Sequence, residues 1–175
     1  MEDLIEFLHR VGELKHLKRA GWIMWGVKDP ESVAEHSFRV TLMALILSEK
    51  MGFDKDKCVK MAIVHDLSEI LAGDMTPYDE ISEGGKHEKE EEAIKKLTEK
   101  LHDKEILELW NEYEERKTPE AKFVYEADKL EMLLQAYEYE KEQKVDLQDF
   151  WEMHKEKIKN PELRKILKSL LEKRK

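Results

Sequence analysis

Five ionisable residues lie in segments of this sequence that are otherwise strongly apolar. They are His36, His65, Asp66, Glu69 and Asp128. Burying an unpaired charge costs several kcal/mol or more, so each needs a compensating partner. Taken singly, a histidine could bond a core carbonyl, and an aspartate could pair with Lys129 or Arg39. Two imidazoles and two carboxylates could also bind one divalent cation together, which would offset the free-energy cost of burying all four side chains. This joint interpretation is favoured, and the candidate metal ligands are His36, His65, Asp66 and Asp128.

The ligand types restrict the metal. Mixed nitrogen and oxygen ligands favour Mn²⁺, Co²⁺, Fe²⁺, Ni²⁺ or Mg²⁺, and the absence of cysteine ligands argues against a structural zinc site. A His-Asp dipeptide alone is weak evidence, because His102-Asp103 lies in KLTEKLHDKEILEL, where Lys and Glu occupy every turn. Asp103 is explained there as the cap of the next helix. The apolar setting is what distinguishes His65-Asp66.

The elements that must position these residues are helices. Gly and Pro number only 7 and 4, whereas good helix formers such as Leu, Lys, Glu, Met and Ala dominate. The charged segment 79–101 is typical of a solvated helix. Apolar spacing and cap residues predict further helices over about 2–18, 32–51, 54–71, 118–144, 147–158 and from 161, with a loop over 21–30. We expect an all-α, single-domain bundle of about seven or eight helices that spans residues 1–175.

Composition excludes several classes of function. The chain of 175 residues has 31 Lys+Arg against 40 Asp+Glu, and its net charge of −9 argues against binding a nucleic-acid polymer. The longest apolar run, Val40 to Leu47, is far shorter than the roughly 20 residues of a membrane-spanning helix. The single cysteine, Cys58, cannot form an internal disulfide, and the acidic N-terminus is unlike a secretory signal. We therefore expect a cytoplasmic protein with no membrane partner.

The segments that contain the candidate ligands resemble a known family. SVAEHSFRV surrounds His36, HDLSEILAGDMTP begins at His65, and YEADKLEMLLQAYEY surrounds Asp128. In this order on an all-α chain, they resemble the HD superfamily of metal-dependent phosphohydrolases, and in particular its YfbR-like and HDDC2-like 5'-deoxynucleotidases. The resemblance covers about Leu14 to Tyr139. It implies an HD-type helical bundle, a divalent metal held by the four candidate ligands, and a homodimer.

The resemblance also implies roles in catalysis and substrate binding. Catalytic roles are implied for Glu69 and Asp74, and nucleotide contacts for Arg19, Trp22 and Asp74. The residues themselves leave other roles open. Glu69 could instead orient a metal-binding histidine. Asp74 could bond the sugar hydroxyl or only cap the turn at 76–77, and Trp22 could pack against the sugar or belong to the core.

Such a site could hydrolyse a phosphomonoester, a reaction with one of the largest uncatalysed barriers. A divalent metal lowers the pKa of bound water and polarises phosphoryl oxygens. We predict hydrolysis of 2'-deoxyribonucleoside 5'-monophosphates to a deoxynucleoside and phosphate. The alternatives are another HD phosphohydrolase activity, on nucleoside triphosphates or nucleotide analogues, and a non-catalytic helical binding protein in which the metal is a structural staple.

Two further groups of residues have no assigned chemistry. Aromatic residues that could cover a dimer interface or belong to the core are Trp110, Tyr113, Tyr137, Tyr139 and Trp151. Histidines without a partner pattern, which are predicted to be exposed, are His9, His16, His87 and His154.

Overall fold

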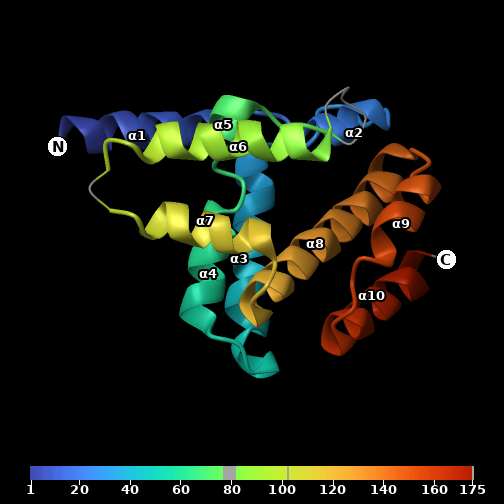
Figure 1. Ribbon diagram of the computed structural model, residues 1–175. Coiled ribbons are helices and arrows are strands. Elements are labelled where there is room, and N and C mark those ends of the chain that lie inside the picture. The colour runs from blue at the N-terminus through green and yellow to red at the C-terminus, as the bar shows by residue number, and fades with distance from the viewer. Residues whose placement is uncertain (77–81, 102, 175) are drawn as a thin grey trace.

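The computed structural model describes residues 1–76, 82–101 and 103–174, except for the side chain of Glu83. Over these residues the chain forms ten α-helices and one 3-10 helix, and an isolated β-bridge pairs Lys18 with Ser32. The helices are α1 (Glu2–Glu13), α2 (Ala20–Met24), α3 (Val33–Leu47), η1 (Glu49–Met51), α4 (Lys55–Val64), α5 (Glu69–Ala72), α6 (Glu83–Thr98), α7 (Glu105–Glu115), α8 (Pro119–Gln143), α9 (Gln148–Lys155) and α10 (Pro161–Arg174). The predicted all-α class is confirmed (Figure 1).

Three helices, α3, α4 and α8, form the centre of the fold. α3 packs against α4, and α8 contacts both and extends towards α9 and α10 (Figure 1). Fully buried apolar side chains of these three helices fill the space between them: Val40, Ala44, Met61, Ala62, Val124 and Leu133. This core fixes α3, the end of α4 and the middle of α8 relative to one another, and the candidate ligands lie on those segments.

Cap residues set the starts of these helices. Ser32 and Glu35 form a capping box, in which the Ser32 hydroxyl accepts from the Glu35 N–H at 3.2 Å and the Glu35 carboxylate accepts from the Ser32 N–H at 2.6 Å. Asp54 caps α4. Thr118 caps α8, and Pro119 occupies its first position, where a missing N–H is harmless.

The predicted helix over 54–71 is divided in the structure. α4 ends at Val64, and residues 65–68 form tight turns before α5 begins at Glu69. The Glu69 N–H bonds the Asp66 carbonyl at 3.1 Å, three residues back rather than four. The Nδ1 atom of His65 donates a hydrogen bond to the Ala62 carbonyl at 2.8 Å, so this side chain satisfies a carbonyl in the last turn of α4. His65 and Glu69 therefore lie at the two ends of a turn and not on one continuous helix.

The N-terminal region differs from the prediction of one long helix followed by a loop. α1 ends at Glu13, and backbone bonds then tie the chain to the segment before α3. The Val33 N–H donates to the Leu17 carbonyl at 2.9 Å. The Arg19 N–H donates to the Glu31 carbonyl at 3.1 Å. The short helix α2 follows within the predicted loop, and α2 and the separate α5 explain why the helices outnumber the seven or eight expected.

Some sequence predictions fall at the edge of what the structure describes. Pro77, in the predicted turn, and His102, in the second His-Asp pair, lie outside the described residues. The N-cap residue of α7 is Lys104, one position after the predicted Asp103, although the Asp103 Oδ1 atom does accept from the Glu105 N–H at 2.8 Å. Within the described ranges, no helix is long and apolar enough to cross a membrane.

Candidate metal centre

Three of the candidate ligands, His36, His65 and Asp66, come together, and Asp128 adjoins them through its contact with His36. His36 comes from α3, His65 and Asp66 from the turn after α4, and Asp128 from α8. The Nε2 atom of His36 lies 3.2 Å from Asp128 Oδ1 and 3.7 Å from Asp66 Oδ2. The Nε2 atom of His65 lies 3.2 Å from the same Asp66 oxygen. One ligand atom each of His36, His65 and Asp66 fall within 4.8 Å of one another, as a shared cation requires.

The hydrogen bonding of the two histidines fits a metal. Both Nε2 atoms are buried and have no hydrogen-bond partner among the described residues, which is costly for a polar atom in the interior. The other ring nitrogen of each histidine is engaged: His65 Nδ1 donates to the Ala62 carbonyl, and His36 Nδ1 contacts the Glu131 carboxylate. Metal-binding histidines characteristically bond a carbonyl or carboxylate in this way, which leaves the opposite nitrogen free for the metal. The donor set therefore suits a divalent cation.

Electrostatics keep both aspartates ionised. Burial alone would raise the pKa of Asp128, but the charges of Lys129, His36 and His65 lower it well below its usual range. Burial likewise opposes the shift of Asp66, whose pKa is lowered by His65, His36 and Arg19. Burial and Arg19 would lower the pKa of His36, yet the neighbouring carboxylates of Glu131 and Asp128 raise it to about 10. The carboxylates around the centre therefore stabilise a positive charge placed among them, whether on an imidazole or on a cation.

Three residues orient the ligands, and the sequence analysis missed this role for Tyr113 and Glu131. Tyr113, considered there only for an interface or the core, donates to Asp128 Oδ2 at 3.2 Å. Lys129 donates to the same oxygen at 2.8 Å, so Oδ1 is the oxygen turned towards His36. Glu131 is fully buried, and its carboxylate contacts the Nδ1 atom of His36, on the side of the ring opposite Nε2. Its position three residues after Asp128, on the same helical face, was the signal that could have identified it.

Glu69 is buried beside the centre. Its side chain is 7% exposed, and its Oε2 atom has no hydrogen-bond partner among the described residues. Burial and the nearby charges of Asp66 and Asp74 raise its pKa well above the usual range. The histidines have other partners, so the contacts do not support the alternative that Glu69 orients one of them.

Arg19 and Asp74 adjoin the centre from outside the core helices. The Arg19 guanidinium lies 3.4 Å from Asp66 Oδ2, and its side chain is 12% exposed. Asp74 Oδ2 accepts from the Ala20 N–H at 2.5 Å, which ties the chain after α5 to the start of α2. Arg19 is the N-cap residue of α2, so the same contact helps to position its side chain.

Trp22 and His154 lie in the interior. Trp22 is 2% exposed, its Nε1 atom donates to Glu31 at 3.0 Å, and its ring centroid is 4.6 Å from that of Phe150. These contacts favour the core interpretation of Trp22 over contact with a substrate. The predicted exposure of His154 is wrong: the side chain is 6% exposed and packs edge-on against Phe150. The other three histidines of that group are exposed.

Comparisons with known proteins agree on one family. A family model described as HD domain matches residues 11–169. The 5'-deoxynucleotidase HDDC2 of Danio rerio is 43% identical, covering 99% of this chain and 89% of its own. The human protein of that name is 42% identical over 96% of this chain and 84% of its own. The crystal structure of the PH0347 protein from Pyrococcus horikoshii OT3 has 41% identity and a TM-score of 0.79, with 97% of both chains covered. This chain belongs to the HD domain family.

Proposed function

We propose that this protein is a metal-dependent 5'-deoxynucleotidase, which converts 2'-deoxyribonucleoside 5'-monophosphates to deoxynucleosides and phosphate. The observation that carries the proposal is a pair of buried imidazole Nε2 atoms without a hydrogen-bond partner in the described part of the chain, which lie beside two ionised aspartates and near the buried acid Glu69. Relatives named 5'-deoxynucleotidase match nearly the whole chain, which supports this substrate class.

The metal ligands in this proposal are His36, His65, Asp66 and Asp128. Their nitrogen and oxygen donors are compatible with Co²⁺, Mn²⁺, Ni²⁺, Fe²⁺ or Mg²⁺. A bound divalent metal lowers the pKa of a water molecule towards neutrality and polarises the phosphoryl oxygens. Tyr113 and Glu131 hold the ligand side chains in place through the contacts described above. We propose that the whole chain forms one domain around this centre.

The substrate residues lie on the Asp66 side of the centre. Arg19 would bind the phosphate through a bidentate contact, and its guanidinium, 3.4 Å from Asp66 Oδ2, lies beside the proposed metal ligands. Glu69 would orient the attacking water or give a proton to the leaving 5'-oxygen, and its raised pKa favours the protonated form. Asp74 would bond a sugar hydroxyl with the oxygen that does not accept from Ala20. Trp22 would act as a positioning residue, because it is the buried residue of α2, whose N-cap residue is Arg19.

A direct test measures phosphate release from a panel of nucleotides. Purified protein with Co²⁺ or Mn²⁺ is expected to hydrolyse dAMP, dGMP and TMP much faster than AMP. Asp128→Ala should lose both bound metal and activity, whereas Asp103→Ala, the acid of the second His-Asp pair, should keep both. Equal rates on deoxy- and ribonucleotides would remove the proposed selectivity. Full activity in the Asp128 variant would contradict the proposed ligand set.

The same panel separates the other candidate functions. Faster hydrolysis of triphosphates or nucleotide analogues would indicate a different HD phosphohydrolase activity. Metal bound in stoichiometric amount without any hydrolysis would indicate a metal-stapled binding protein. We disfavour the staple because it needs only the ligands, whereas the chain also keeps Glu69 buried beside them, with an Oε2 atom that has no hydrogen-bond partner among the described residues.

The assembly and location belong to the same proposal. We propose a homodimer, on the basis of the family resemblance. We also propose a cytoplasmic location, because the single cysteine is buried and free, as suits a reducing compartment.

A further inference from the structure

Basic side chains gather beside Asp128, at the edge of the candidate metal centre. The Lys129 Nζ atom donates to Asp128 Oδ2 at 2.8 Å and lies 5.1 Å from the centre of the Tyr125 ring. The Arg116 guanidinium carbon lies 4.7 Å from the centre of the same ring. Two cations therefore share one aromatic ring next to a candidate metal ligand, an arrangement that helps to hold both side chains in place.

A third cation comes from the segment that follows α9. The backbone N–H groups of Lys159 and Asn160 both donate to Glu126 Oε2, at 2.7 and 2.6 Å. Glu126 belongs to α8 and precedes Asp128 by two residues, so these bonds hold the segment against the part of α8 that carries the candidate ligand. Lys157 lies on this segment and is half-buried.

Together these cations favour an anion. Burial lowers the pKa of Lys157, and the charges of Lys129 and Arg116 lower it further, against the opposing charge of Asp128. Within the described ranges, Lys157 has no side-chain ion pair or hydrogen bond, and the side-chain hydrogen bond of Arg116 goes to the Glu114 carbonyl. Asp128 is the carboxylate that serves both Lys129 and the candidate metal. In a chain with a net charge of −9, this local excess of positive charge stabilises a bound anion.

His154, on α9, also lacks a partner. Its side chain is 6% exposed, and neither ring nitrogen has a hydrogen-bond partner in the part of the chain that the structure describes. Burial and the charges of Lys157, Lys129 and Arg19 lower the pKa of His154 to about 3, whereas the charge of Asp128 opposes this shift. The charged groups that act on this ring are therefore those around the metal centre. At neutral pH the ring is uncharged and can donate one hydrogen bond, and leaving it unpaired in the interior is costly.

We propose that Lys157, Lys129 and a ring nitrogen of His154 form a second phosphate position beside the metal centre. It is distinct from the position of the scissile phosphate, which the proposed function gives to the metal and Arg19. Two ammonium groups and one neutral donor match the oxygens of a phosphate group, which lysine commonly binds in proteins. Arg116 adds positive charge at the edge of the position.

A phosphate group can reach this position from two sources. In the proposed function, the nucleoside lies on the Asp66 side of the centre, with Arg19 and Asp74. A second phosphate linked to the first would extend away from the nucleoside, towards Asp128 and Lys129, so a nucleoside 5'-diphosphate is one source. Inorganic phosphate, the product of hydrolysis, is the other. The choice between them rests on the proposed function, whereas phosphate binding itself requires no turnover.

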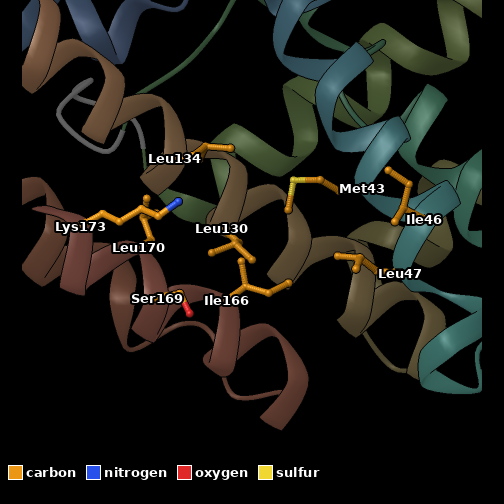
Figure 2. Close-up of a pocket in the computed structure, with 9 residues that line it drawn as sticks. All are labelled: Met43, Ile46, Leu47, Leu130, Leu134, Ile166, Ser169, Leu170 and Lys173. Atoms are coloured by element: carbon orange, nitrogen blue, oxygen red, sulfur yellow. The ribbon is translucent and has the colours of Figure 1, made fainter.

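The cavity between α3, α8 and α10 has a different chemistry and supplies a control. Figure 2 shows Met43, Ile46 and Leu47 on the α3 side of this cavity of about 350 Å³, and apolar residues of α8 and α10 on the other side. Lys173 is the charged side chain among its lining residues, and it has no ion pair within the described ranges. A single ammonium group among apolar side chains lacks the further donors that a phosphate requires.

Side-chain NMR of His154 tests the position, because its ring reports phosphate locally. The full chain, loaded with Mg²⁺, which is diamagnetic, is titrated with inorganic phosphate. We expect a saturable shift of the His154 ring signals, with the exposed His9 and His16 as internal references. Lys157→Gln removes one charge-assisted hydrogen bond and should raise the apparent Kd about tenfold or more. Lys173→Gln removes an exposed charge at the other cavity and should change the Kd by less than about twofold.

Two further titrations identify the source of the phosphate. Non-hydrolysable phosphonate analogues of dAMP and dADP are compared through the same NMR shift and by calorimetry. If the second phosphate of a nucleotide occupies the position, only the diphosphate analogue shifts His154, and its advantage in affinity over the monophosphate analogue is lost in Lys157→Gln. If inorganic phosphate is the occupant, it shifts His154 in protein that is already saturated with the monophosphate analogue.

Several results would overturn the proposal. One is a His154 signal that none of these probes shifts. Another is an unchanged Kd in Lys157→Gln, or equal weakening in Lys173→Gln, which would indicate a general effect of charge. A shift that vanishes in Arg19→Gln but persists in Lys157→Gln would place the phosphate at the scissile position alone. Circular dichroism checks the fold of each variant. These readouts measure binding, so a failure of the proposed enzymatic function appears separately, in the phosphate-release panel.

Discussion

Glu131→Gln tests whether the carboxylate behind His36 sets the affinity of the centre for its metal. Glu131 is fully buried, and its two oxygens contact two donors, His36 Nδ1 and Arg39 Nε, the latter at 2.7 Å. Glutamine has nearly the same shape but only one acceptor oxygen, so one of these donors would face an NH₂ group. It also removes the negative charge that makes the imidazole a stronger ligand. Removing such a partner typically weakens metal binding 10–100-fold, or about 1.4–2.8 kcal/mol.

The assay is a titration of the metal-free protein with Co²⁺ or Mn²⁺, by calorimetry or by competition with a chelator. Glu138→Gln is the matched control, because Glu138 also binds Arg39, at 2.8 Å, but does not contact a candidate ligand. We expect the control to change the metal Kd by less than about fivefold, as for a partly exposed ion pair. An unchanged Kd in Glu131→Gln would refute the role of this carboxylate. Equal weakening in both variants would show that the effect comes from Arg39.

Four further predictions follow from the described contacts. Tyr113→Phe removes one donor to Asp128 Oδ2 but leaves Lys129, so metal affinity measured by the same titration should fall by about tenfold or less. Glu69→Gln should retain bound metal by elemental analysis, while kcat falls about 10²–10⁴-fold; a rate within twofold of wild type would exclude a catalytic role. Burial raises the pKa of Cys58 to about 12, so the thiolate is scarce at pH 8 and a thiol reagent should react only after denaturant is added. Met61→Ala should lower the free energy of unfolding by about 2–5 kcal/mol in urea titrations, because Met61 is fully buried.

The parts of this fold that the sequence predicts are those with local causes. Asp54 and Thr118 cap helices as expected, and α3 begins next to the predicted Ser32, because a helix start depends on residues only a few positions away. The burial of the candidate ligands could also be predicted, since their neighbours are apolar. Contacts between distant segments could not. Tyr113 on α7 donates a hydrogen bond to Asp128 on α8, 15 positions later in the sequence. Hydrophobic periodicity within either helix does not indicate this contact.

The turn after α4 explains how two consecutive residues serve one centre. Successive side chains of an α-helix diverge by about 100°, so an uninterrupted helix would direct His65 and Asp66 to different sides. The structure ends α4 at Val64, and the tight turns that follow bring His65 Nε2 and Asp66 Oδ2 to 3.2 Å from each other. The same turns place Glu69 at the start of α5, where it is buried near the charges of Asp66 and Asp74. Helical periodicity identifies the apolar setting of these residues, but the geometry of the centre depends on the point at which that periodicity stops.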